Sequence, residues 1–307
     1  MYSDPVDGPR RMDGHATGHQ EATAGPLVHA LYVDDCQAVL RRWPDACVDH
    51  CIADPPFNIS RRRGLGWAFS SHITMQEAWD RFSADEFFAF NIAWLREVCR
   101  VVKPNGNIIV FGTYHNIYLL GTILQSVLNR RILNSIIYYK PNAQPNITAR
   151  TLTESTEQII WAVNEAPGRA RKWTFNYWRA KELNGGRQMR NLWEFPTTPR
   201  SERRFGKHPA QKPLALVERL VELATNPGDL LLDPFAGTGT LAVAATRLGR
   251  RWVLIENAPE YAVIARRRIA AEVGITPCTP SASSPSSGGV AESEAKHAVQ
   301  EPDVPDL

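Results

Sequence analysis

Residues 54–57 read Asp-Pro-Pro-Phe and follow directly on a strand-like run at 48–53, whose apolar members are Val48, Cys51, Ile52 and Ala53. The two prolines cannot donate to a β-ladder and each restricts the residue before it, so a strand must end here. The result is a rigid loop with one carboxylate, Asp54, and one ring, Phe57, which we expect to be exposed. In an open α/β sheet, a loop at the carboxyl end of a strand is where ligand chemistry is found. A plain strand-ending turn is the alternative interpretation.

A second chemical pattern begins at three consecutive leucines, 230–232, which predict a buried strand. This strand ends in "DPFAGTGT" (233–240), which opens an Ala-rich helix, and a further strand at 252–256 ends in an acid, Glu256. Glycines let backbone N–H groups approach a ligand, and an acid after the second strand can bond both ribose hydroxyls. The unit therefore predicts a site for an adenosine-type ligand.

The glycine loop alone does not identify that ligand. Gly237, Gly239 and Ala242 fit the G-x-G-x-x-[GA] pattern of dinucleotide enzymes, so a nicotinamide-dependent dehydrogenase is an alternative. Asp233 speaks against it, because a carboxylate before the loop would repel a pyrophosphate but would suit an amino or sulfonium group. The loop also lies late in the chain, with little room after it for the rest of a dinucleotide fold.

Basic and aromatic side chains gather in residues 169–207, where eleven Lys and Arg face three acids and seven aromatic residues interleave. Phosphates attract cations and unstacked bases need flat faces, so this composition favours a nucleic-acid surface over a merely solvated one. A second basic group follows the Asp54 loop. The residues predicted to contact DNA are Arg61, Arg62, Arg63, Lys172, Arg187, Arg190 and Arg203.

Apolar runs and helical patterns alternate along the chain. Helices are predicted at 84–102 and 115–128, and strands at 107–111, 132–140 and 157–164. Such alternation implies an α/β fold whose mostly parallel sheet is covered by helices on both faces. Neighbouring strand ends meet at the switch point of such a sheet, which would bring positions 54 and 237 into one pocket.

The two ends of the chain differ from the middle in composition. Residues 1–25 and 277–307 are predicted to be disordered tails around a domain at 26–276. The formal net charge of +3 hides this division, because the tails carry −2 and −4 and the domain carries +9. No apolar run could span a membrane, and five scattered cysteines indicate a reducing compartment, so we expect a cytoplasmic protein. "CVDHC" (47–51) is better explained by buried cysteines than by a metal site.

"DPPF", "HPAQKP" and "DPFAGTGT", in this order, resemble the DNA amino-methyltransferases of restriction–modification systems, and more narrowly their β group, in which the catalytic motif precedes the cofactor motif. The resemblance covers about 28–272. It implies a Rossmann-like, S-adenosylmethionine-dependent methyltransferase fold with a target-recognition region at about 140–207. The middle segments, 133–164 and 175–195, are similar to those of members that methylate adenine at N6. Leu254, Tyr138 and Phe57 depart from the common residues Gly, Trp and Tyr of the group.

The resemblance also implies roles for individual residues. Asp54, Pro55, Pro56 and Phe57 would form the catalytic loop: Asp54 and the Pro55 carbonyl would accept the N–H bonds of the target amino group, and Phe57 would stack on a flipped-out base. The residues implied for S-adenosylmethionine are Asp35 for the adenine, Asp233 for the methionine ammonium, Lys212 for its carboxylate, Glu256 for the ribose, and Phe235, Gly237 and Gly239 for the loop. His208 is expected to be structural.

The leading hypothesis is a site-specific DNA adenine-N6 methyltransferase. Cytosine-N4 methylation uses the same chemistry and stays an alternative, and an inactive nucleic-acid-binding module is a further one. The expected partners are double-stranded DNA, with single-stranded DNA as an alternative, and a cognate restriction endonuclease. The chain is expected to be a monomer or a homodimer, with no bound metal and no membrane contact.

Overall fold

The computed structural model describes residues 25–60, 80–146 and 150–280. Within these residues eight strands form one sheet in the order β1-β8-β7-β2-β3-β5-β4-β6. Their bounds are β1 Ala30–Val33, β2 His50–Ala53, β3 Asn107–Gly112, β4 Arg131–Tyr139, β5 Thr156–Val163, β6 Leu192–Glu194, β7 Leu230–Asp233 and β8 Arg251–Glu256. All neighbouring pairs are parallel except those that β5 makes with β3 and β4. The predicted mostly parallel α/β sheet is therefore confirmed, with one reversed strand.

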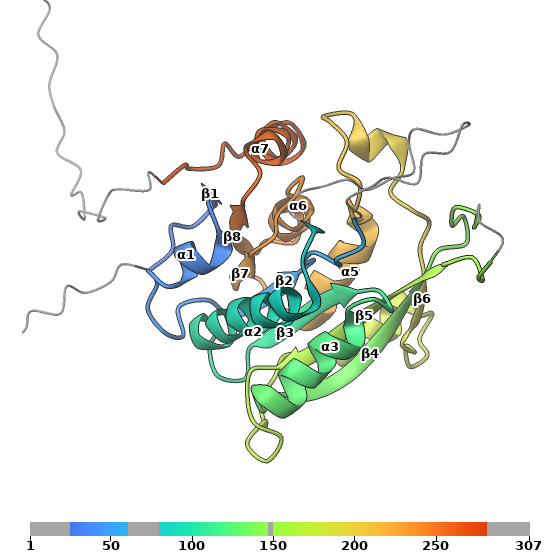
Figure 1. Ribbon diagram of the computed structural model, residues 1–307, viewed down its shortest axis with the longest axis horizontal. Helices are drawn as coiled ribbons and strands as arrows, with labels where there is room; N and C mark the ends of the chain where they lie inside the picture. Colours follow the sequence, from blue (N-terminus) through green and yellow to red (C-terminus); the bar gives the residue numbers. More distant parts are fainter. Residues whose placement is uncertain (1–24, 61–79, 147–149, 281–307) are drawn as a thin grey trace, which may run out of the picture.

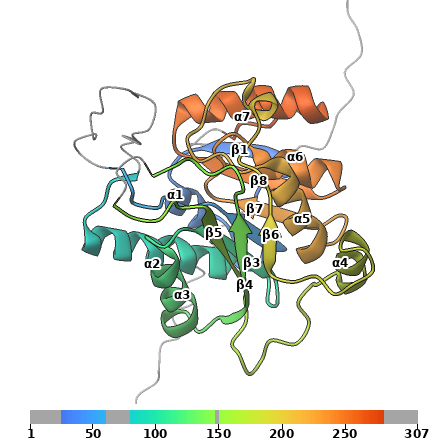
Figure 2. The ribbon, with the colours of Figure 1, turned by 90° about the vertical axis from the view of Figure 1, so that its right-hand side faces the viewer.

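Helices cover both faces of the sheet, as Figures 1 and 2 show. They are α1 Cys36–Leu40, α2 Ala84–Val101, α3 Ile117–Thr122, α4 Tyr177–Leu183, α5 Leu214–Ala224, α6 Thr240–Arg247 and α7 Pro259–Val273. A π-helical turn, Ile123–Val127, extends α3, so the predicted helix at 115–128 is built from two kinds of turn. None of the helices in the described ranges is long and apolar enough to span a bilayer.

Two hydrophobic clusters, one on each face, hold these layers together. α1, α2 and α3 pack on one face, and α5, α6 and α7 pack on the other. Because side chains alternate along a strand, Ile109 and Phe111 of β3 enter the second cluster, whereas Ile108 and Val110 enter the first. Both faces of β3 are buried, which explains why its sequence is continuously apolar.

Local signals set the ends of the elements that frame the site. α2 begins with a capping box, in which Ser83 accepts from Glu86 N and the Glu86 carboxylate accepts from Ser83 N. At the start of α6, Gly239 has φ 74°, and a Cβ there would lie 2.9 Å from Ile269 Cδ1 of α7. Glycine at 239 therefore permits both the turn and the close approach of α7.

β2 and β7 form the switch point of the sheet. They lie side by side, with Cys51 opposite Leu232. After β2 the chain passes through α2 to β3, and after β7 it passes through α6 to β8 on the opposite side. The two connections leave in opposite directions, so a crevice opens between the carboxyl ends of β2 and β7.

The end of the described chain corrects one predicted boundary. Cys278 N donates to His29 O, and Leu31 N donates to Cys278 O, so this residue pairs with the edge strand β1. The domain thus continues past the predicted boundary at 276. Residues 1–24 and 281–307 lie outside the described residues.

Candidate active site

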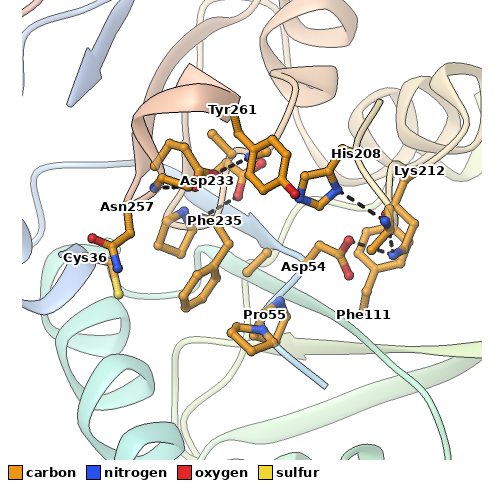
Figure 3. A pocket seen from close by; sticks show the side chains of 18 of the residues that line it. Cys36, Asp54, Pro55, Phe111, His208, Lys212, Asp233, Phe235, Asn257 and Tyr261 are labelled. Carbon is orange, nitrogen blue, oxygen red and sulfur yellow. Dashed lines mark hydrogen bonds and ion pairs between the residues drawn. The ribbon is translucent and has the colours of Figure 1, made fainter. Parts of the chain in front are cut away.

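One cavity of about 400 Å³ fills the crevice at the switch point. Figure 3 shows Asp54 and Asp233 pointing toward it from neighbouring strands, with His208 and Lys212 arriving from a third segment. Ten of the eleven residues predicted for catalysis or cofactor binding line it: Asp35, Asp54, Pro55, Pro56, Phe57, Lys212, Asp233, Phe235, Gly237 and Glu256. Gly239 does not line it. Positions 54 and 237 therefore share one pocket, as their chain positions predict.

The catalytic loop is held by a carboxylate that sequence analysis missed. Asp80 is fully buried and accepts three backbone N–H bonds, from Asn58 at 2.6 Å and from Ile59 and Ser60 at 2.8 Å each. Asn58, which has φ 59°, accepts in turn from Phe82 N at 2.9 Å. Asp80 and Asn58 thus connect the two sides of the loop. No sequence motif marks Asp80, which lies 26 residues after Asp54.

Asp54 follows the last residue of β2, and its two oxygens have different surroundings. Oδ2 accepts from Lys212 Nζ at 2.6 Å, whereas Oδ1 is buried and has no hydrogen-bond partner within the described residues. Burial raises the pKa of Asp54 to about 6, although Lys212 opposes this rise. The pKa of Asp54 is thus close to neutral pH, and one of its two carboxylate oxygens is an unused acceptor.

Phe57 is not the exposed ring that the sequence suggests. Its side chain is only 7% exposed, and Lys212 Nζ lies 5.0 Å from the ring centroid. The loop folds back against the segment that carries Lys212, which covers the ring while leaving it part of the cavity wall. Pro56 O accepts a long hydrogen bond, 3.5 Å, from Asn116 at the end of β3.

Asp233 is a buried carboxylate without a cation. Its Oδ1 accepts from Phe235 N at 3.0 Å, and no ion pair to it is found in the described part of the chain. Burial raises its pKa to about 8, and the nearby carboxylates Asp54 and Glu256 add to the rise. A carboxylate in this state gains stability when a cationic group binds beside it.

Glu256 and Asp35 close the opposite wall of the cavity. Glu256 accepts from Gly237 N at 2.7 Å and from Ala258 N at 2.9 Å, so its carboxylate fixes the glycine loop. Burial raises the pKa of Glu256 to about 6 against these two hydrogen bonds. Asp35 caps α1 by accepting from Ala38 N at 3.0 Å, and it lines the cavity at the helix start.

Lys212 is 6% exposed, and its ammonium group is already surrounded by acceptors. Besides Asp54, it donates to Ala210 O at 3.2 Å and forms an ion pair with Glu157 at 3.4 Å. The structure therefore does not present Lys212 as a free cation for a ligand carboxylate, which was its expected role.

His208 lines the cavity and Arg268 lies behind its wall; the sequence predicted neither position. His208 packs edge-on against Tyr261, with centroids 4.3 Å apart, and burial lowers its pKa to about 4, so the ring is neutral. Arg268 of α7 is fully buried and donates to the hydroxyls of Thr238 and Thr240. His208 belongs to the cavity wall, and Arg268 anchors the glycine loop from behind.

The basic and aromatic segment at 169–207 splits between two edges of the sheet. Arg171 N and Lys172 N donate to Asn105 in the turn before β3, and Asn176 N donates to Leu223 O at the end of α5. These contacts place 169–183 at the amino ends of the parallel strands, opposite the cavity. Only the later part, from 200 on, runs along the carboxyl edge, and the chain reaches the cavity just after this segment, at 208–212.

The predicted DNA contacts divide in the same way. Arg203 lies on the segment at the carboxyl edge. Lys172 lies at the amino edge, and Arg190 lies beside Asn134 and Leu223, away from the cavity; Arg187 is exposed on the turn before it. The predicted target-recognition region at about 140–207 is therefore not one continuous surface, because β5 within it is an interior strand of the sheet. Its role in reading DNA stays a prediction. Arg61, Arg62 and Arg63 lie outside the described residues.

The aromatic rings of 169–207 are also divided between buried and exposed positions. Trp193 and Phe195 are buried, and Arg219 of α5 stacks on both, at 5.4 and 4.4 Å from their centroids. Trp178 is 72% exposed, but it lies on α4 at the amino edge. No single surface therefore presents all seven rings to one ligand.

The charges of the cavity favour a cationic ligand. Five carboxylates line it, those of Asp35, Asp54, Asp80, Asp233 and Glu256. Lys212 and Arg81 are the cations among the described lining residues, and Lys212 is neutralised by Asp54. A ligand that carries a sulfonium and an ammonium group suits this excess of negative charge, and Phe235 and Tyr261 supply apolar surface for a flat ring.

Comparisons with known proteins agree with this geometry. The family model for N6/N4 methyltransferases, described as DNA methylase, matches residues 48–267. The type II methyltransferase M2.DpnII of Streptococcus pneumoniae is 40% identical over 80% of this chain and 90% of its own length. M2.MboI of Moraxella bovis is 35% identical over 78% and 86%.

Solved structures show the same arrangement. The M1.HpyAVI–SAM complex aligns with a TM-score of 0.58 and 26% identity, over 78% of this chain and 98% of that one. The cytosine-N4-specific PvuII DNA methyltransferase aligns with a TM-score of 0.61 over 78% and 85%, but at 19% identity it supports the fold alone. The chain belongs to the N6/N4 DNA methylase family.

Proposed function

We propose that this DNA methyltransferase transfers a methyl group from S-adenosylmethionine to the exocyclic N6 of an adenine that is extruded from DNA. The observation that carries the proposal is a single cavity in which two buried carboxylates from neighbouring strands, Asp54 and Asp233, each lack a partner that a ligand can supply. Adenine is chosen because residues 133–164 and 175–195 are similar to those of adenine-specific members.

The residues of the cavity fit S-adenosylmethionine, which supplies an electrophilic methyl group. Asp233 would hold the ammonium group, because it is a buried carboxylate whose pKa of about 8 falls when a cation binds. Glu256 would accept the ribose hydroxyls through lone pairs left over from its two backbone bonds. Asp35 would face the adenine ring, and Phe235 would pack against the cofactor.

Asp54 and Pro55 would orient the target amino group. Its nitrogen is a poor nucleophile because the lone pair is delocalised into the base. Asp54 Oδ1 and the Pro55 carbonyl would each accept one N–H, which bends the nitrogen out of conjugation and directs its lone pair into the cavity. Alignment of this kind contributes about 7–11 kcal/mol, more than the roughly 10²–10⁴-fold expected from proton transfer. Asp54 then takes the proton that the methylated nitrogen releases.

The target base has to leave the helix to reach this cavity, because its amino group is paired inside a duplex. Phe57 forms the wall beside Asp54 and would contact the base through the part of its ring that faces the cavity. Duplex DNA would lie along the carboxyl edge of the sheet, where Arg203 and the exposed side chains of Arg200 and Lys207 are found. We further propose that the chain works in the cytoplasm, beside a cognate restriction endonuclease.

The test is to incubate the purified chain with labelled S-adenosylmethionine and duplex DNA of mixed sequence, and to identify the labelled nucleoside after digestion. We expect N6-methyl-2′-deoxyadenosine, and a rate at least about 100-fold lower for Asp54→Ala because both the acceptor and the orientation are lost. Asp45→Ala is the matched control. Its carboxylate is exposed and pairs with Arg100 away from the cavity, so its activity should equal that of the wild type.

Each remaining outcome selects another function. Label in N4-methylcytosine would move the target to the alternative base. Equal activity of wild type and Asp54→Ala would contradict the proposed site, and binding of NAD without any change in DNA would favour the dehydrogenase. DNA binding without label, under conditions where the cofactor binds, would favour an inactive nucleic-acid-binding module.

A further inference from the structure

Four charged side chains of alternating sign form a row behind the catalytic loop. Asp54 pairs with Lys212 at 2.6 Å, Lys212 with Glu157 at 3.4 Å, and Glu157 with Lys140 at 3.3 Å. They come from four separate segments: the end of β2, the segment before α5, the start of β5 and the end of β4. Glu157 does not line the cavity, so it has no direct access to a ligand there.

Lys212 is fixed in the middle of this row from several sides. Its ammonium group contacts oxygens of Asp54, Ala210 and Glu157. The rings of Phe57 and Phe111 lie 5.0 and 5.4 Å away, so the alkyl chain and the charge are both enclosed. Movement of Lys212 toward a ligand would leave Asp54 without a cation and Glu157 with Lys140 alone, which is costly where the charges are largely buried.

We propose, on the basis of the adenine methyltransferase function above, that Lys212 and Glu157 are positioning residues for Asp54. Lys212 occupies Oδ2 and so leaves Oδ1 as the oxygen that accepts from the target amino group. Glu157 holds Lys212 at Asp54 and keeps it from the cavity. The methionine carboxylate is then bound by other groups.

The two residues act on Asp54 with opposite signs. Lys212 lowers the pKa of Asp54 by charge and by hydrogen bonding, whereas Glu157 raises it, and burial raises it most. The other charged groups around the site are Asp233, Glu256, Asp35, Asp80 and Arg81 along the cavity and Lys140 behind Glu157. His208 near Lys212 is neutral above a pH of about 4. An active enzyme needs ionised Asp54, so the acid limb of the rate–pH profile reports this balance.

The experiment measures single-turnover methylation of adenine as a function of pH for Lys212→Met and Glu157→Gln. Lys212→Met removes the cation, so the acid limb should move to higher pH by about 1–3 units, and the rate at pH 8 should fall. Glu157→Gln removes an anion but keeps an oxygen that can still accept from Lys212, so the acid limb should move to lower pH. Shifts in opposite directions are expected from a pair that acts on Asp54 by charge.

Lys103→Met is the matched control. Lys103 pairs with Asp49 at the same distance, 2.6 Å, but before β3 at the other edge of the sheet, and its variant should leave the acid limb in place. Thermal unfolding of each variant establishes that it is folded, and Glu157→Gln carries the test if Lys212→Met does not fold.

Three results would overturn the inference. Lower rates with an unmoved acid limb would mean a purely structural role. Displacement in the same direction in both variants would contradict the opposed charges. A raised KM for S-adenosylmethionine in Lys212→Met, with kcat and pH profile unchanged, would return Lys212 to the methionine carboxylate. Failure of the wild type to methylate adenine would instead refute the function itself, so the two failures are distinguishable.

Discussion

The two edges of the sheet treat their buried polar groups in opposite ways. At the amino edge, Asp229 accepts from His50 at 3.1 Å and from Asn226 N at 2.6 Å. Burial alone would raise the pKa of Asp229, but these hydrogen bonds outweigh it and the pKa is lowered. Asn107 of the same edge donates to Thr174 O and Ala224 O and accepts from Trp161.

At the carboxyl edge, burial dominates instead. Asp54, Asp233 and Glu256 all have a raised pKa, to about 6, 8 and 6, and Asp54 and Asp233 lack a partner on the side of the cavity. Asp229 and Asp54 are similarly part-buried, with 22% and 20% of their side chains exposed, so burial alone does not distinguish the two edges. The difference is whether the described residues complete their hydrogen bonds and charges, and the incomplete ones mark the side where we expect a ligand to bind.

The largest effect is expected from a substitution of Asp233, which would remove the feature that distinguishes the carboxyl edge. Asp233→Asn keeps the oxygen that accepts from Phe235 N but removes the charge that would pair with the ammonium of S-adenosylmethionine. Loss of a buried ion pair of this kind costs about 3–5 kcal/mol, so cofactor affinity should fall by roughly 150- to 4,000-fold. Titration calorimetry measures it, with Asp229→Asn as the matched change at the other edge. Unchanged affinity in Asp233→Asn would remove Asp233 from the cofactor site.

The same two variants also test the difference between the edges through the pH dependence of their stability. A carboxyl whose folded pKa is raised binds more protons folded than unfolded, so its contribution to stability falls as pH rises from about 4 to 8. Asp233 behaves in this way, and the ligand-free Asp233→Asn protein should gain Tm over the wild type by an amount that grows from pH 5 to pH 8.

The pKa of Asp229 is shifted in the opposite direction, so its effect on stability has the opposite pH dependence. Its lowered pKa means that its contribution is fully present above the unfolded value of about 3.8 and is lost only as pH falls further. Asp229→Asn should therefore lose about 1–2 kcal/mol, nearly constant from pH 5 to pH 8. Thermal unfolding at several pH values checks both. Parallel curves for the two variants would mean that the edges do not differ in the way described.

Much of the pocket is encoded locally and could be predicted. The Pro-Pro pair ends β2 after Asp54, the glycine loop opens α6 after Asp233, and alternating elements imply the parallel order that brings both loops to one switch point. Each of these signals acts within a few residues, or through a general rule of sheet topology. The sequence also contains a signal for the reversed direction of β5. Residues 140–155, between β4 and β5, show no helical pattern, whereas parallel neighbouring strands need a crossover connection.

The remaining features depend on which distant segments meet. Glu157 reads as one polar residue of a strand, and nothing near it in sequence indicates that it lies behind Lys212. Phe57 is covered because the 208–212 segment folds over it, and Asp80 holds a loop more than twenty residues away. The basic composition of 169–207 predicts one surface, but within this segment the chain passes from the amino edge to the carboxyl edge of the sheet. Composition carries no information on such a crossing.

The smallest expected effect concerns Lys172, whose place at the amino edge separates it from the side proposed to face DNA. Lys172 is exposed, and among the residues that the structure describes only its backbone N–H is bonded, to Asn105. Lys172→Ala should change the free energy of unfolding by less than about 0.5 kcal/mol and leave KM for DNA within about two-fold of the wild type. Binding to duplex DNA at several salt concentrations is the decisive measurement, because each phosphate contact contributes about 0.9 to the slope of log K against log salt. A slope smaller by that amount in Lys172→Ala would show that DNA also contacts the amino edge, and the two edges would then share the DNA rather than divide ligand binding from structural support.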